Sequence, residues 1–364
     1  MDKTLAWLWL ADAVGSACQY AQELLTLYPD PVELYDLLRT GSEAPPACLT
    51  PHALAQLRDT TPFDYEERLD HCLLSGIDIL TPDEGTYPDR LRDLPDLPLV
   101  LYVTGSAACL NGGRYAGMVG TRRPSTYGRQ AAFDLSLAMA RAGVVLVSGL
   151  ADGLDSAGHR AAVKNNCPTI AVMGVPIDRT YPAANVVLRH KIEQKGCVIS
   201  EYPPRSEGVG PNGFLQRNRL IAALSSALLV VEAQEKSGTM STVSHAERYG
   251  KPVFAVPGSI YSPNSAGTNG LLRDGRARAV CSAADLLGPL GLRRQSAAAV
   301  TAKQPEPLSE NERKVLSCIG PQPLGIEELC VRSGLPTAVL LGTLMKLELS
   351  GRVLCMPGKR YVIK

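Results

Sequence analysis

Short, continuously apolar runs alternate with longer amphipathic stretches through the middle of the chain. The predicted strands are residues 77–80, 99–103, 116–120, 144–148, 169–173, 197–200, 227–231 and 253–256, and the predicted helices are 126–142, 152–165, a segment after Pro182, 214–225 and 238–249. Continuously apolar strands are typical of a parallel sheet that helices cover on both faces. The alternation therefore predicts a doubly wound α/β fold, in which ligands bind where the strands end.

Both ends of the chain differ from this pattern. Residues 1–72 contain apolar helical stretches broken by prolines, which predict a small helical domain suited to packing or interaction. The central region, 73–286, is followed by a compositional linker at 287–307 and a C-terminal region, 308–364. Three helical segments and a hairpin there predict a winged helix, at residues 310–319, 326–333, 336–350, 352–355 and 361–363. The third segment contains a single cation, Lys346, so it suits protein contact better than reading a DNA groove.

Charge is distributed unevenly, although the formal net charge is only +1. Residues 1–98 hold 18 acidic against 6 basic side chains, whereas residues 99–364 hold 18 acidic against 31 basic ones. Such asymmetry indicates nucleic-acid contact by the basic part, and two solvated surfaces of opposite sign are the alternative interpretation.

Cysteine usage and hydropathy indicate the compartment. The ten cysteines form no Cys-x-x-Cys pair and no zinc-ligand spacing, and no apolar run approaches the ~18 residues of a membrane span. The N-terminus lacks the basic region and cleavage site of an export signal. We therefore expect a cytoplasmic protein with reduced, mostly buried thiols, no metal and no membrane contact.

The stretch 115–128 is the most informative one. A buried strand breaks at Gly120 into a polar loop with Arg122 and Arg123, and a helix follows. This order presents backbone N–H groups and a positive helix end to a phosphate. Residues 114–133 hold four arginines and no carboxylate, which favours a polyanionic ligand.

Loops after other predicted strands add to this edge. Small residues open the helices that follow two of these loops, at Ser148-Gly149 and Ser237-Gly238-Thr239, and they predict anion nests. A further cluster, Phe214 to Arg219, offers an aromatic ring for base stacking beside cations for phosphates, and stacking contributes roughly 1–3 kcal/mol per base. The alternative is a core Phe214 with both arginines of the cluster paired to carboxylates such as Glu201 or Glu232.

Enzymatic interpretations find little support. Ser148, Asp155 and His159 lie close in sequence, but no Gly-x-Ser-x-Gly elbow surrounds the serine. We attribute Asp155 to the helix macrodipole and His159 to a solvated helix face. The dinucleotide fingerprint Gly-x-Gly-x-x-Gly is missing after the strand 116–120, which disfavours a dehydrogenase.

The central region closely resembles the DNA-processing protein A (DprA, or Smf) family of natural transformation. The resemblance rests on residues 119–128, 148–163, 181–185, 199–204, 214–225, 230–242 and 251–259. It implies an extended Rossmann-like domain, flanked by a helical SAM-like domain and a winged helix. The implied function is to bind single-stranded DNA, form a homodimer and load RecA recombinase, with no catalysis and no cofactor.

The resemblance also implies roles for single residues. Arg122 would neutralise a backbone phosphate and Phe214 would meet a base, while Arg217 and Arg219 would support the groove or fix its loops, and Lys236 would add a cation. The predicted interface comprises Gly120, Arg122, Arg123, Ser148, Gly149, Phe214, Arg217, Asn218, Arg219, Lys236, Ser237, Gly238 and Thr239. Relatives often carry a lysine shortly before the aromatic residue, and the loop 208–213 has none.

A second family shares the broad superfold. Cytokinin-activating phosphoribohydrolases carry Pro-Gly-Gly-x-Gly-Thr-x-x-Glu at the strand–helix turn that corresponds to residues 235–242 here. Thr242 occupies the position of that family's catalytic glutamate. Without this carboxylate, cleavage of an N-glycosidic bond lacks its candidate general acid or base, so we rank this enzyme second to DNA binding.

Overall fold

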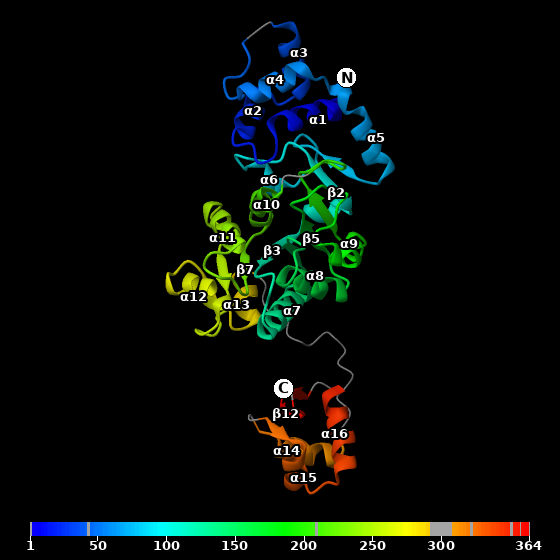
Figure 1. Ribbon diagram of the computed structural model, residues 1–364, viewed down its shortest axis with the longest axis vertical. Coiled ribbons are helices and arrows are strands. Elements are labelled where there is room, and N and C mark those ends of the chain that lie inside the picture. The colour runs from blue at the N-terminus through cyan, green and yellow to red at the C-terminus, as the bar shows by residue number, and fades with distance from the viewer. Residues whose placement is uncertain are drawn as a thin grey trace. The chain divides into compact units, whose positions relative to one another are not determined.

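The computed structural model describes residues 2–41, 44–207, 210–291, 308–320, 323–349, 352–356 and 358–363 (Figure 1). The chain forms two compact units, residues 1–294 and 295–364. The predicted boundary between residues 72 and 73 falls inside the first unit, and most of the predicted linker lies outside the described residues.

A nine-stranded sheet forms the centre of the first unit. Its strands are β1 (Asp78–Leu80), β2 (Leu101–Gly105), β3 (Arg114–Val119), β4 (Val144–Ser148), β5 (Thr169–Val172), β6 (Cys197–Ser200), β7 (Leu228–Val230), β8 (Val253–Ala255) and β9 (Arg278–Ala279), in the order β1-β2-β6-β5-β4-β3-β7-β8-β9. Neighbours from β6 to β9 are parallel, whereas β2 pairs antiparallel with both β1 and β6. The predicted doubly wound sheet is confirmed, and it gains an antiparallel edge and the short β9.

Helices cover both faces of this sheet, which explains why β4, β5, β6, β7 and β8 are buried along their whole length. The helices of the central region are α6 (Asp89–Arg92), α7 (Thr126–Arg141), α8 (Leu154–Lys164), α9 (Val186–Glu193), α10 (Pro211–Leu224), α11 (Gly238–Arg248), α12 (Ala266–Arg273) and α13 (Ala283–Leu287). One core cluster joins β3 and β4 to α7 and α8 through Met118, Ala132 and Leu154, and the other joins the opposite face to α10 and α11. Figure 1 shows α7 beside α8 and α10 beside α11, as the contacts between these helices confirm.

The N-terminal helices pack around one apolar helix. They are α1 (Lys3–Val14), α2 (Ala21–Leu27), α3 (Pro31–Thr40), α4 (Pro51–Asp59) and α5 (Glu66–Leu74). In α1, Trp7 and Trp9 are almost completely buried, as expected for a helix that is hydrophobic on all sides. Pro31 and Pro51 occupy the first positions of α3 and α4, where the missing N–H costs nothing.

The second unit has winged-helix architecture, as predicted. Its elements are α14 (Glu310–Cys318), α15 (Ile326–Ser333), α16 (Thr337–Leu349), β10 (Leu324–Gly325), β11 (Val353–Met356) and β12 (Arg360–Ile363). The three strands pair antiparallel in the order β10-β12-β11, and Val315, Leu340 and Tyr361 contribute to their shared core. Throughout the described ranges of both units, no helix combines the length and hydropathy needed to cross a membrane.

Candidate functional site

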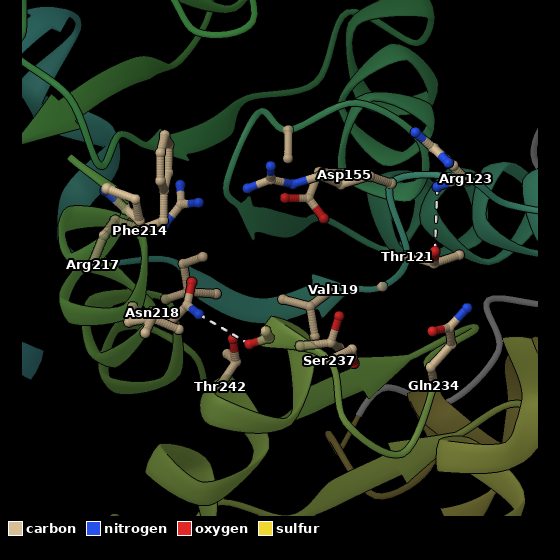
Figure 2. Close-up of a pocket in the computed structure, with 18 of the residues that line it drawn as sticks. Val119, Thr121, Arg123, Asp155, Phe214, Arg217, Asn218, Gln234, Ser237 and Thr242 are labelled. Atoms are coloured by element: carbon tan, nitrogen blue, oxygen red, sulfur yellow. Dashed lines mark hydrogen bonds between the residues drawn. The ribbon is translucent and has the colours of Figure 1, made fainter.

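A pocket of about 660 Å³ lies at the carboxyl end of β3, between the first turns of α10 and α11 (Figure 2). Nine of the thirteen residues predicted for the interface line it, namely Gly120, Arg122, Arg123, Phe214, Arg217, Asn218, Ser237, Gly238 and Thr239. The other four, Ser148, Gly149, Arg219 and Lys236, do not line it. Most of the predicted interface residues therefore converge on one pocket, as the β–α alternation predicted.

An aromatic and cationic cluster forms one wall of the pocket. Phe214 lies in the first turn of α10 and is half-buried, so its ring remains partly accessible. The guanidinium of Arg122 lies 5.4 Å from the centre of this ring, within the range of a cation–π interaction. The ring of Tyr181 lies 5.2 Å away at 44° and is itself 49% exposed. Two rings and a cation thus share one accessible surface.

Arg217 braces the floor of the pocket from inside. Its side chain is buried, and Nη1 donates hydrogen bonds to the carbonyl oxygens of Gly149, at 2.8 Å, and Val172. Burial lowers the pKa of Arg217 to about 10, and the nearby Asp155 carboxylate offsets part of that effect. A Cβ on Gly149 would lie 2.6 Å from the guanidinium, so a larger residue there would displace Arg217 from this position. Arg217 therefore joins the ends of β4 and β5, one of the two roles predicted for it.

Arg219 is not part of the accessible interface, so its predicted contact with DNA is corrected. Its side chain is 1% exposed, Nη2 donates to the Glu201 carboxylate, and Nε lies 3.5 Å from Asp96. The alternative interpretation, an arginine paired with Glu201, describes this residue. The cause is the position of Arg219 in the second half of α10, where every residue from 219 to 224 is buried.

The predicted anion nest at Ser148-Gly149 is already filled. Ser148 is fully buried and its hydroxyl donates to the carbonyl oxygen of Met118 at 2.6 Å, while the Gly149 N–H donates to Asp155 at 3.1 Å. Because the Gly149 N–H already donates to the carboxylate of Asp155, it is not available to bind an anion, and this prediction is wrong. Burial is the main reason that the pKa of Asp155 is raised to about 6.

The N-terminus of α7 is occupied in the same way. The carboxylate of Glu232 accepts hydrogen bonds from the backbone N–H of Ser125 at 2.9 Å and from its hydroxyl at 2.5 Å. The Ser125 hydroxyl in turn accepts from the N–H of Gly128 at 3.0 Å. The predicted phosphate cradle at this helix end is therefore closed, and an anion would meet the side chains of Arg122 and Arg123 instead.

The N-terminus of α11 is open to the pocket. Ser237 occupies the N-cap position without capping the helix, and its buried hydroxyl has no partner among the described residues. Gly238 and Thr239 line the pocket, and Asn218 holds this turn in place by donating to the carbonyl oxygen of Gly238 at 3.2 Å, as Figure 2 shows. Free amides at a helix start attract anions, so the predicted nest at 237–239 remains a candidate.

The remaining predicted cations lie at the surface. Arg122 and Arg123 are exposed, and the carbonyl oxygen of Arg123 accepts from the side chain of Asn264 at 2.9 Å, which fixes the loop. Lys236 is exposed immediately before Ser237. The edge thus combines exposed cations with an aromatic wall and an open helix end.

A hydrolytic site is not formed by Ser148, Asp155 and His159. His159 is fully buried, and its Nδ1 lies 2.8 Å from the hydroxyl of Thr169, so its assignment to a solvated face was wrong. Burial and the charge of Arg217 lower the pKa of His159 to about 3. The Ser148 hydroxyl donates to the carbonyl oxygen of Met118 and not to His159. In the described residues, no group of three or more His, Cys, Asp or Glu side chains could hold a metal ion.

Sequence reasoning missed Tyr181 as a site residue. It lies in the loop between β5 and α9, and its ring lies next to that of Phe214 in the wall of the pocket. A signal was present, since Tyr181 is an aromatic residue in a loop that follows a predicted strand, at the edge where ligands of such sheets bind. Gln234 and Asn264 also line the pocket without having been predicted.

Comparisons with known proteins identify the family of this chain. Residues 78–291 match the family model of DNA recombination-mediator protein A, and residues 299–359 match that of the DprA winged helix domain. A putative DNA processing protein DprA from Mycobacterium tuberculosis is 35% identical, over 99% of this chain and 94% of its own. The DNA processing protein DprA of Bacillus subtilis is 37% identical, over 59% and 72%.

Two solved structures resemble the chain. DprA from Streptococcus pneumoniae has a TM-score of 0.66 at 29% identity and covers 79% of this chain and 98% of its own. DNA processing protein A from Helicobacter pylori, which has a single-stranded DNA binding mode, has a TM-score of 0.54 at 33% identity and covers 59% and 95%. With its central sheet, its winged helix and a relative matched over nearly its whole length, the chain belongs to the DprA/Smf family of DNA recombination mediators.

Proposed function

We propose that this protein binds single-stranded DNA, without sequence preference, in the pocket at the carboxyl edge of β3. The observation that carries the proposal is the accessible ring of Phe214 with Arg122 above it and Tyr181 beside it. An aromatic face stacks on any base, and a cation beside it neutralises the adjoining phosphate. The single-stranded DNA binding mode of the H. pylori relative supports this choice of ligand.

Open donors extend the same surface. The amides at the start of α11 face the pocket, with the hydroxyl of Ser237 unpartnered beside them among the described residues. Arg123 at the pocket and Lys236, which immediately precedes the pocket-lining Ser237, are exposed and would replace the cation that is missing before Phe214. Because most of these groups are suited to phosphate, affinity falls with salt, by about 0.7 in the log–log slope per phosphate neutralised on a single strand.

Family membership also supports the partner, the location and the oligomeric state that we propose. The strand is held for transfer to RecA recombinase during natural transformation, in the cytoplasm, and two copies associate through their central domains, residues 73–286. The flanking domains, 1–72 and 308–364, assist without binding the strand at this pocket. Light scattering of the purified chain should give a mass near twice 38.8 kDa.

Ligand choice is tested by fluorescence anisotropy with labelled oligo-dT and a matched duplex, each titrated at several salt concentrations. We expect the single strand to bind more tightly than the duplex, because stacking on Phe214 requires an unpaired base. Equal affinity for both would remove the stacking role and with it the preference for single strands.

The chain is proposed to be non-catalytic, and a nucleotide assay tests the phosphoribohydrolase alternative. Thr242 lines the pocket where that family has its glutamate, and the only carboxylate among the described pocket-lining residues, Asp155, already accepts the Gly149 N–H. Incubation with adenosine 5′-monophosphate, followed by chromatography, should release no adenine. Release of adenine at enzymatic rates would restore the hydrolase.

A further inference from the structure

A second groove of about 590 Å³ lies on the outer side of the sheet's helices, where α7, α8 and α9 meet. Four cations line it: Arg160 and Lys164 from α8, Lys191 from α9, and Lys195 two residues after α9 ends. Among the described residues, no carboxylate lines this groove. It therefore concentrates positive charge on a face that the pocket at β3 does not use.

These four cations lack ion-pair partners within the described part of the chain. Arg189 and His190 on the same helix both pair with Glu193, whereas no described carboxylate lies within ion-pair distance of the four groove cations. Arg160 and Lys164 are four residues apart on α8, a spacing at which like charges destabilise a helix. An arrangement that is unfavourable in the free protein becomes favourable when a polyanion binds.

The groove repeats the chemistry of the pocket at β3. Nζ of Lys164 lies 5.6 Å from the ring centre of Phe133, which is half-buried, just as Arg122 lies 5.4 Å from that of Phe214. Beside it, Val187 is 66% exposed. An accessible ring under a cation and an apolar neighbour suit an unpaired base next to a phosphate.

One short segment connects the two surfaces. Tyr181 lines the pocket at β3 and Ala184 lines the groove, and three residues span at most about 11 Å. Asn185 anchors this segment by donating to the carbonyl oxygen of Leu150 at 3.0 Å and to the hydroxyl of Ser156 at 2.9 Å. The two surfaces are therefore close enough for one strand to contact both.

We propose that the α7–α8–α9 groove is a second contact site for the same DNA strand and lengthens the footprint beyond the pocket at β3. The inference rests on the proposed function and deepens it. Continuity with the pocket and the repeated cation-over-phenylalanine pair favour a nucleic acid over an acidic peptide as the occupant.

The test compares oligo-dT of about 5 and about 20 nucleotides, which bracket the site sizes of simple single-strand binders. The variant carries Lys164→Ala, Lys191→Ala and Lys195→Ala, which removes three of the four groove cations. A control with Arg58→Ala, Arg141→Ala and Arg248→Ala removes equal charge from positions outside both surfaces. Circular dichroism melting checks that both variants fold.

We expect the groove variant to bind the short oligonucleotide as the wild type does, and to bind the long one with a salt slope reduced by about 2, since each lost phosphate contact contributes about 0.7. The control variant should reduce the salt slopes of the short and the long oligonucleotide equally, and by less than the groove variant reduces the slope of the long one. Phe133→Leu should weaken only the long oligonucleotide, without changing its slope.

A wild-type slope for the long oligonucleotide in the groove variant would overturn the inference while leaving the pocket at β3 intact. The inference also fails if an acidic peptide, but not DNA, loses its binding in that variant. If the wild type binds neither oligonucleotide, the proposed function itself fails, and the short oligonucleotide distinguishes that result from failure of the groove alone.

Discussion

The rim and the floor of the pocket contain arginines in different states. At the rim, Arg122 and Arg123 are exposed, and Arg122 lies over an aromatic ring. In the buried interior, Arg217 of the pocket floor donates to two backbone carbonyl oxygens, and Arg219, which does not line the pocket, contacts two buried carboxylates. The same residue type is thus available to a ligand in one region and holds the protein together in the other.

This difference teaches that a cluster of cations indicates a polyanion only where the protein leaves it unpaired. Solvent can screen and rearrange the rim, so removing a charge there changes binding with little effect on folding. Removing a charge from the floor leaves its partners buried and uncompensated, which costs folding free energy. Stability and DNA affinity, measured on the same variants, therefore separate the two regions.

The largest effect is expected for Arg219→Ala. Glu201 and Asp96 would then remain buried with no cation beside them, and breaking a buried ion pair in this way costs about 3–5 kcal/mol. We expect a clearly lower urea midpoint, whereas Arg122→Ala as the control should keep the wild-type midpoint. Unchanged stability of the Arg219 variant would mean that solvent reaches Glu201 and Asp96, and the contrast between exposed and buried arginines would fail.

A second effect depends on pH, because the titratable side chains of His159 and Asp155 are buried. His159 has a pKa near 3, below its ordinary value of about 6.5, so its contribution to stability is complete above pH 6.5 and is lost as pH falls toward 3. Asp155 has a pKa near 6, above its ordinary value, so its contribution is present below about pH 4 and is lost as pH rises toward 6. Between pH 4 and 6 the two oppose each other.

Urea unfolding at pH 4 and 6 resolves these contributions. In His159→Gln only the Asp155 contribution remains, so the stability of the variant relative to wild type should rise about tenfold in the folding equilibrium per pH unit of acidification. In Asp155→Asn the opposite trend is expected. If the stability difference from wild type does not vary with pH in either variant, neither group is buried as described.

The strands and helices of this molecule were predictable from the sequence because they depend on local periodicity. The strands 144–148 and 197–200 have their predicted bounds, since every residue of β4 and β6 is apolar or small and buried. The helix predicted from residue 214 begins at Pro211 instead, because proline suits a first helical turn. Phe214 consequently lies within that turn, facing the pocket.

The state of each polar side chain was not predictable in the same way. Glu201 and Asp96 are 18 and 123 residues from Arg219 in the chain, so no local pattern reveals the pairing. His159 has the spacing of a solvated face relative to Asp155, but its partner Thr169 lies on β5 under the same helix. Burial is decided by packing between elements, which the sequence of one element does not contain.

Phe214→Ala tests the aromatic wall of the rim. We expect binding of oligo-dT to weaken by roughly 1–3 kcal/mol, since one stacked base loses its platform, with the salt slope unchanged. Phe63→Ala is the control, because Phe63 is 56% exposed in the N-terminal helical region, away from the pocket. Anisotropy titrations measure both, and equal affinities of the two variants would place the bases elsewhere.

Arg122→Ala should give the smallest change in free energy but the most specific one. The guanidinium is exposed and forms no ion pair with a described carboxylate, so its loss leaves no partner uncompensated and stability stays at the wild-type value. Binding should weaken equally for all oligonucleotide sequences, and the log–log salt slope should fall by about 0.7–1, the contribution of one phosphate.

Arg217→Lys, by contrast, keeps the charge but loses the planar donors that join β4 to β5, so it should lower stability and leave the slope unchanged. A slope that responds to Arg217 and not to Arg122 would reverse the roles of rim and floor, because counterion release follows only those cations that the strand itself reaches.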